Sequence, residues 1–187
     1  MKVLNIENRL LKDAVNALPK DELTNIRLVA AKIFAKTGFP SQREEEWKYT
    51  NLRPIYDLTN DWLSKKSYFD SETLIRSCED ITKKIKNTIK ANWIVIANGR
   101  VVSEWSNISD IQINKIRDNH IVDSLDKDPL AALNAALLIE GIHIKINKNI
   151  KVNSPIGIIY IDDSSKTLTQ NRIILDIEEG SKIKFIE

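Results

Sequence analysis

The stretch that decides the fold is Gly38-Phe39-Pro40-Ser41-Gln42-Arg43-Glu44-Glu45-Glu46-Trp47-Lys48-Tyr49-Thr50, whose residue order follows neither a helical nor a strand period. Gly38 predicts a helix end, because glycine adopts the left-handed backbone of a C-cap without strain. Pro40 prevents that helix from resuming, since the residue before a proline is pushed to extended geometry. Ser41 and Glu44 have the spacing of a capping box, in which each side chain satisfies a free backbone N–H of a new helix.

The same stretch therefore predicts a short third helix that begins near Ser41 and ends near Asn51, because Pro54 disfavours its continuation. Acidic residues crowd its first turn, where the helix dipole favours negative charge. Trp47 and Tyr49 follow as large side chains with an apolar body and a polar tip. We expect these two aromatic residues to anchor the helical part of the chain on the strands that follow.

This segment resembles the motif near the N-terminus of the SufB/SufD family, and within it of SufD, a component of the SUF iron–sulfur cluster assembly machinery. The positions that carry the resemblance, and to which we assign a structural role, are Arg43, Glu45, Trp47, Lys48, Tyr49 and Thr50. Gln42 stands where the family pattern has a basic residue, which weakens any anion-contact role at that position.

Further stretches agree with the family in order and spacing. They are Asn98-Gly99-Arg100 after an apolar run, Leu133-Asn134-Ala135-Ala136 followed by Gly141, Asn171-Arg172-Ile173-Ile174-Leu175, and the closing Phe185-Ile186-Glu187. The resemblance covers nearly the whole chain, but only the N-terminal part of a family member. It implies an N-terminal helical domain followed by the first turns of a right-handed parallel β-helix.

Composition sets outer limits on function. The net charge of +2 on 187 residues offers no strong field for nucleic acid or for membrane lipid. No apolar run approaches the roughly 20 residues that a membrane span needs, and the N-terminus lacks the apolar core of a secretory signal. Cys78 is the single cysteine and has no intramolecular disulfide partner. These features are typical of a cytoplasmic protein.

Helical periods precede strand periods along the chain. Apolar residues recur at helical spacing over 6–18, after Asp21, and over 71–90, whereas 55–69 shows no clear period. The lysines at positions 83, 84, 86 and 90 are best explained as a solvated helix face.

At Asn92 the period changes. Residues 93–97 predict a buried strand, Asn98-Gly99 predicts a tight hairpin turn, and 107–127 is interpreted as a loop. Asp128-Pro129 opens another helix, with Asp as cap and Pro at the first position, and Gly141 ends it.

Short strands follow Gly141, over 142–146, 156–161, 173–177 and 183–185. Their periodicity is equally compatible with a coiled β-solenoid and with a β-sandwich. The resemblance implies the solenoid. We therefore predict an α+β fold with three parts: a helical domain over 1–90, a β-hairpin and connecting helix over 91–141, and the start of a β-helix over 142–187. A solenoid that stops without a cap exposes unpaired backbone groups. We expect either a truncated piece of a longer protein or an open β-edge covered by a partner, including a homodimer through that edge.

Candidates for catalysis are few. His120 and His143 are the only histidines, and Cys78 is separated from both in the predicted layout. One cysteine does not hold an iron–sulfur cluster, which usually needs several thiolates. The carboxylates Asp162-Asp163 and Asp176, Glu178 and Glu179 are interpreted as solvated turn residues. We predict no catalytic, cofactor-binding or metal-binding residue in this chain.

The resemblance implies a non-catalytic scaffold subunit that acts with SufB and the ATPase SufC in a SufBCD complex. In that complex the iron–sulfur cluster is what the family assembles, and we predict that this chain binds no cofactor itself. Two alternatives remain at this point: a stand-alone protein–protein interaction module, and an enzyme built on a β-solenoid.

Overall fold

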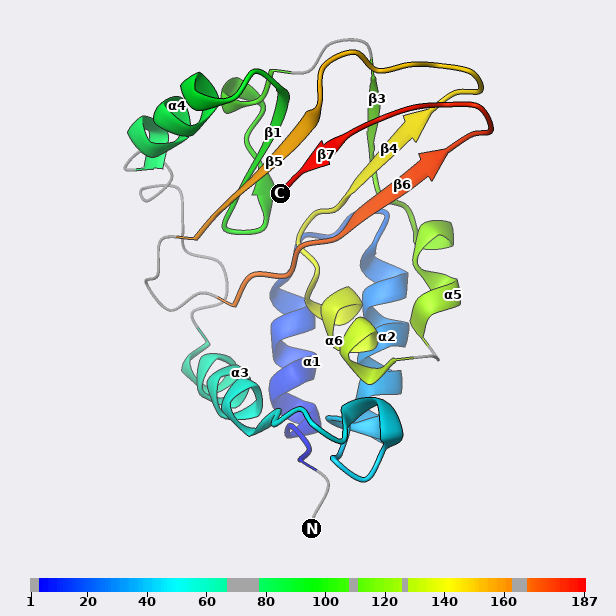
Figure 1. Ribbon diagram of the computed structural model, residues 1–187. Coiled ribbons are helices and arrows are strands. Elements are labelled where there is room, and N and C mark those ends of the chain that lie inside the picture. The colour runs from blue at the N-terminus through cyan, green and yellow to red at the C-terminus, as the bar shows by residue number, and fades with distance from the viewer. Residues whose placement is uncertain (1–3, 67–77, 108–110, 126–127, 163–167) are drawn as a thin grey trace. The chain divides into compact units, whose positions relative to one another are not determined.

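The computed structural model describes residues 4–66, 78–107, 111–125, 128–162 and 168–187 (Figure 1). The chain divides into two compact units. Unit 1 comprises Met1–Phe69 and Arg117–Ile139, and unit 2 comprises Asp70–Ile116 and Glu140–Glu187. The three sequence ranges predicted as domains are a different division of the chain and stay a prediction. Within the described ranges, no helix combines the length and hydropathy needed to cross a bilayer.

Unit 1 is helical, and α2 lies at its centre. Helices α1, α5 and α6 all pack on α2, and α3 packs on α1 (Figure 1). The elements are α1 (Asn8–Ala17), α2 (Thr24–Thr37), the 3-10 helix η1 (Glu45–Trp47), α3 (Arg53–Lys65), the 3-10 helix η4 (Asp118–His120), α5 (Val122–Leu125) and α6 (Pro129–Leu137). The buried side chains that join them include Leu11, Ala14, Val15, Ile26, Ala30, Phe34, Leu63, Ala132, Leu133 and Ala136.

The helices predicted over 6–18, after Asp21 and after Asp128 are confirmed as α1, α2 and α6, although α6 ends at Leu137 and not at Gly141. The start of α6 follows its sequence signal closely. The Asp128 carboxylate accepts a hydrogen bond from the Leu130 N–H at 2.8 Å, and Pro129 occupies the first helical position. A cap of this kind satisfies a backbone donor that the helix itself leaves free.

Two segments of the chain differ from the sequence interpretation. Residues 53–65 form α3, although Pro54 predicts that a helix does not continue there. Proline is tolerated in the first turn because the missing N–H has no helical partner there, and the Asn51 side chain accepts from the Arg53 N–H at 3.1 Å. The loop predicted over 107–127 is also wrong, since β3 (Gln112–Lys115) and α5 lie within it.

Arg27 on α2 is a charged side chain buried in the interior of unit 1, with 1% of its surface exposed. Its Nε donates to the Leu138 carbonyl at 2.8 Å and its Nη2 to the Ile139 carbonyl at 2.9 Å. Its Nη1 donates to the Pro19 carbonyl at 2.8 Å and to Asp21 Oδ1 at 2.7 Å. One guanidinium therefore ties α2 both to the turn after α1 and to the chain that follows α6.

Replacement of this guanidinium tests how much the network stabilises unit 1. Arg27→Leu leaves buried carbonyl groups without donors, and each such group costs about 1–3 kcal/mol. We expect urea denaturation to show a loss of about 3 kcal/mol or more in the free energy of unfolding. The matched control is Arg53→Leu, which removes an exposed guanidinium and its pair with Asp57. Equal effects of the two substitutions would contradict the assignment.

In its described residues, unit 2 contains two small mixed sheets and one α-helix, α4 (Glu79–Thr88) (Figure 1). A four-stranded sheet has the order β2-β1-β5-β7, and a three-stranded sheet has the order β3-β4-β6. Besides β3, the strands are β1 (Asn92–Ala97), β2 (Arg100–Val101), β4 (Ile142–Ile146), β5 (Ile156–Ile161), β6 (Ile173–Ile177) and β7 (Phe185–Ile186), and a 3-10 helix, η3 (Ser103–Trp105), follows β2.

The core of unit 2 lies between its two sheets. Alternate residues of β1, β4 and β5 form one cluster, because successive side chains of a strand point to opposite faces. The cluster contains Ile94, Ile96, Ile142, Ile144, Ile146, Ile156 and Ile158. The other face of the four-stranded sheet buries Trp93, Val95 and Ile159. The strands of residues 93–97, 142–146, 156–161 and 173–177 are thereby confirmed as elements.

The predicted right-handed parallel β-helix is wrong. Both sheets are mixed and neither is closed or coiled as a solenoid. Asn98 and Gly99 adopt positive φ angles of 48° and 76°, so the chain turns back and β2 pairs antiparallel with β1. Strand β3 pairs antiparallel with β4, while β5 and β6 add to the sheets in parallel. The α+β class is correct, but its β part is two small mixed sheets.

The predicted helix over 71–90 is confirmed for the part that the structure describes. Helix α4 covers Glu79–Thr88, and residues 71–77 lie outside the described residues. Its N-cap position is Cys78, which is buried. Ile81, Ile85 and Ile89 are exposed by about 40–60% on one side of this segment. Helical spacing alone did not tell whether these residues face the core.

Gly157 on β5 tests the parallel register of β1 and β5. Gly157 pairs with Trp93, and a Cβ on Gly157 would overlap the indole ring of that buried tryptophan. We expect Gly157→Ala to lower the free energy of unfolding by about 1–3 kcal/mol, the usual cost of overpacking. Adding Trp93→Leu should recover part of that loss in a double-mutant cycle. Additive effects of the two substitutions would contradict the register.

Candidate functional site

The motif segment of residues 38–50 leaves α2 through a glycine, as predicted. Gly38 has a φ of 67°, and its N–H donates to the Phe34 carbonyl at 2.7 Å. A residue with a side chain is strained at that backbone angle. The helix end predicted from Gly38 is confirmed.

Phe39 fixes this segment to the core of unit 1. Its side chain is 1% exposed, and its N–H donates to the Leu4 carbonyl at 2.9 Å. Its ring meets those of Phe34 and Tyr56 edge to face, with centroids 5.3 and 5.6 Å away. Such aromatic pairs add stability beyond the area they bury. Sequence analysis missed this anchor; its signal was a large apolar residue between Gly38 and a proline.

The predicted capping box forms only in part, because the Ser41 side chain accepts from Arg43 and not from Glu44, and it does not start an α-helix. Glu44 Oε1 accepts from the Ser41 N–H at 2.8 Å, and Ser41 Oγ accepts from the Arg43 N–H at 3.3 Å. The residues that follow make only η1, over Glu45–Trp47. The third helix predicted near Ser41–Asn51 is therefore a turn followed by a 3-10 helix.

The motif residues are mainly displayed on the surface. Arg43, Glu45, Lys48, Tyr49 and Thr50 are exposed, and Trp47 is half-buried. Tyr49 is 88% exposed. Lys48 lies 4.0 Å from Glu45 and 5.5 Å from the centroid of the Tyr49 ring. The structure thus brings Glu45, Lys48 and Tyr49 together as surface neighbours, and the anchoring of the strands by Trp47 and Tyr49 stays a prediction.

Alanine substitutions distinguish these aromatic residues. Phe39→Ala should cost about 3–5 kcal/mol of unfolding free energy, as large-to-small core changes do. Trp47→Ala should cost less because Trp47 is only half-buried, and Tyr49→Ala should leave stability nearly unchanged. Thermal and urea denaturation measure the order. A larger loss of stability for Tyr49→Ala than for Phe39→Ala would contradict the assignment of Phe39 as the anchor.

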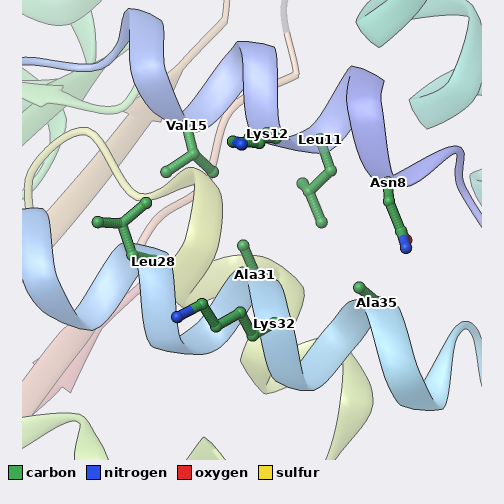
Figure 2. A pocket seen from close by; sticks show the side chains of 8 residues that line it. All are labelled: Asn8, Leu11, Lys12, Val15, Leu28, Ala31, Lys32 and Ala35. Carbon is green, nitrogen blue, oxygen red and sulfur yellow. The ribbon is translucent and has the colours of Figure 1, made fainter.

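A groove runs between α1 and α2, and we call it the α1–α2 groove (Figure 2). Its volume is about 250 Å³. The two helices run antiparallel, with Asn8 opposite Ala35 at one end and Val15 opposite Leu28 at the other (Figure 2). The lining residues are Asn8, Leu11, Lys12, Val15, Leu28, Ala31, Lys32 and Ala35.

Positive charge borders this groove. Lys12 on α1 and Lys32 on α2 are both exposed, and neither has an ion-pair partner among the described residues. No carboxylate lines the groove. The acidic side chain of α1, Asp13, pairs instead with Lys66 at 3.5 Å. The groove therefore has an apolar floor and a cationic rim.

The carboxylates at the end of β6 are paired with lysines. Lys145 lies 3.1 Å from Glu178, and Lys148 lies 2.9 Å from Glu179. The hydrogen bond from Lys145 and the one from the Lys148 N–H lower the pKa of Glu178 below its ordinary value of 4.5. Among the residues described, no three His, Cys, Asp or Glu side chains are grouped as metal ligands.

The remaining candidate groups are divided between the two units. Cys78 and His143 belong to unit 2, and His120 belongs to unit 1, where its Nδ1 accepts from the Arg117 N–H at 3.1 Å. His143 Nε2 lies 3.8 Å from Asp176. Burial and a hydrogen bond with Glu187 raise the pKa of Tyr160 to about 12, so the phenol keeps its proton at neutral pH.

Comparison with known proteins places the chain in a family. A family model described as the SufBD protein N-terminal region matches residues 9–125. Over 63 residues the chain is 30% identical to the iron–sulfur cluster assembly protein SufD of Bacillus subtilis (strain 168). That alignment covers 34% of this chain and 14% of the relative. The chain belongs to the SufB/SufD family, and the matched part is the N-terminal region of that family.

The family match includes the motif segment and the hairpin of β1 and β2, but it ends before α6 and before β4 to β7. The resemblance carried by Arg43, Glu45 and Trp47 is therefore confirmed at the level of the family. The likeness proposed for residues 171–175 and 185–187 lies outside the matched region.

Proposed function

We propose that this chain takes part in iron–sulfur cluster assembly as a non-catalytic scaffold that acts with SufB and the ATPase SufC. The observation that carries the proposal is the match of residues 9–125 to the SufBD N-terminal region. The relative from Bacillus subtilis, which is named as an iron–sulfur cluster assembly protein, supports the pathway.

The geometry of unit 1 supports a structural role. Arg27 joins α2 to segments on both sides of it through backbone carbonyls, and Phe39 fastens the motif segment to the same core. Both residues stabilise the packing of unit 1. Packing and buried hydrogen bonds of this kind hold exposed side chains in fixed positions for a partner.

Edge strands supply a second surface for assembly. Strand β7 is an edge strand of the four-stranded sheet, and β6 is an edge strand of the three-stranded sheet. Leu175 and Ile177 on β6 are exposed by 45% and 43%. An open edge with apolar side chains can accept a further strand from another chain. Pairing of a second copy along this edge stays a prediction of the proposal.

Co-expression with SufB and SufC of the same genome tests the proposal. An affinity tag on this chain should recover SufB and SufC together, and deletion of its gene should lower the activity of iron–sulfur enzymes when iron is scarce. The gene carrying Arg27→Leu serves as a destabilised control and should complement the deletion less well than the unaltered gene. Unchanged iron–sulfur enzyme activities after deletion, with neither partner recovered, would refute the role.

A further inference from the structure

We propose that the α1–α2 groove is a docking site for an amphipathic helix of a partner protein, one that carries aliphatic side chains along one face and acidic side chains beside them. This inference goes beyond the scaffold assignment and does not depend on it. It rests on the shape of the groove, on the charges at its rim and on the lack of ion-pair partners for those charges among the described residues.

The shape fits side chains better than a small molecule. Ala31 and Ala35 present small side chains on α2, across the groove from Leu11 and Asn8 of α1, and so leave a depression between the helices (Figure 2). Its volume of about 250 Å³ is below the roughly 300–1,000 Å³ of most small-molecule sites. Leu28 adds an apolar side chain at one end and is 37% exposed.

The length of the groove sets the spacing of the occupant. From position 28 to position 35, α2 rises about 10 Å, at about 1.5 Å per residue. An amphipathic helix that lies in a groove inserts side chains at i, i+3 or i+4, and i+7, which span the same distance. Two or three leucine-sized side chains therefore match the apolar floor.

The rim charges set the chemistry of the occupant. Lys12 on α1 and Lys32 on α2 lie on the two sides of the groove (Figure 2), and neither is ion-paired within the described part of the chain. Carboxylates on both flanks of a docked helix would meet one lysine each. Complementary charges of this kind favour the correct partner and speed its association.

The same charges argue against a second copy of this chain as occupant. Two α1–α2 surfaces face to face would bring lysines against lysines, which repel. Helix α4 has an exposed apolar side, but its three lysines, Lys83, Lys84 and Lys86, outnumber its two acidic residues, Glu79 and Asp80. An acidic helix from another protein is the occupant that the charges favour.

The test uses the full chain and a labelled synthetic peptide. The peptide is about 16 residues long, because shorter isolated helices are only marginally stable. It carries leucines at i, i+4 and i+7, with glutamates on both flanks. A second peptide has lysine at every glutamate position, and vesicles rich in phosphatidylserine form a third arm. Fluorescence anisotropy measures peptide affinity, and co-sedimentation measures vesicle binding.

We expect the glutamate peptide to bind and the lysine peptide to bind at least tenfold more weakly. Lys32→Glu should weaken binding by about tenfold by reversing one rim charge, and Ala31→Leu should do so by filling the floor. Lys84→Glu on α4 is the matched control and should leave affinity unchanged. Circular dichroism checks that each variant is folded.

Three outcomes would overturn the proposal. One is failure of the intact chain to bind the glutamate peptide. Another is equal loss of affinity in Lys32→Glu and Lys84→Glu. The third is binding to anionic vesicles that Lys32→Glu abolishes while peptide binding is absent, which would make the surface a lipid contact. None of these results bears on the recovery of SufB and SufC, so the two proposals fail separately.

Discussion

The helical unit depends on one buried guanidinium. The buried guanidinium of Arg27 donates hydrogen bonds to protein groups instead of to water. Its acceptors are the carbonyls of Leu138, Ile139 and Pro19 and the carboxylate of Asp21. A buried charge is costly unless hydrogen bonds satisfy it, so these acceptors must stay in place for α2 to remain buried. Because they come from segments far apart in the sequence, the guanidinium fixes the ends of α1 and α6 against α2. Two of these helices form the α1–α2 groove, and the motif segment follows directly after α2.

Local signals predicted much of the fold. The Asp128-Pro129 start of α6, the Gly38 end of α2 and the Asn98-Gly99 hairpin each depend on a backbone requirement that only a few residue types meet. The strands of unit 2 were found because isoleucine alternates along them. Sequence analysis failed where one residue has two structural uses: Pro54 both breaks and begins helices, and here it begins α3.

The order and direction of the strands in the sheets could not be predicted from the sequence pattern. Alternating isoleucines say which side of a strand is buried, but not which strand is its neighbour or in which direction that neighbour runs. The antiparallel pairing of β3 with β4 joins segments separated by the whole of α6, and no local signal marks such a contact. The resemblance to a β-helical family favoured the solenoid, and the mixed sheets corrected it. The family itself was predicted correctly, because Arg43, Glu45 and Trp47 carry a specific order of residues.

The roles of individual side chains were also only partly predictable from the sequence. The conspicuous aromatics of the motif, Trp47 and Tyr49, are half-buried and exposed, whereas Phe39 is the residue held in the core. The groove had no sequence signature, since alanines at helical spacing are also typical of a tightly packed interface. Its lysines become informative only once their lack of ion pairs among the described residues is known.

Native-state hydrogen exchange on the intact chain and on Arg27→Leu tests the central role of the guanidinium most directly. The account predicts that the substitution lowers amide protection in α1, α2 and α6 together, by a similar factor in each, while β1 and β5 of unit 2 keep theirs. Protection that is lost only around residue 27, or that falls equally in both units, would contradict it.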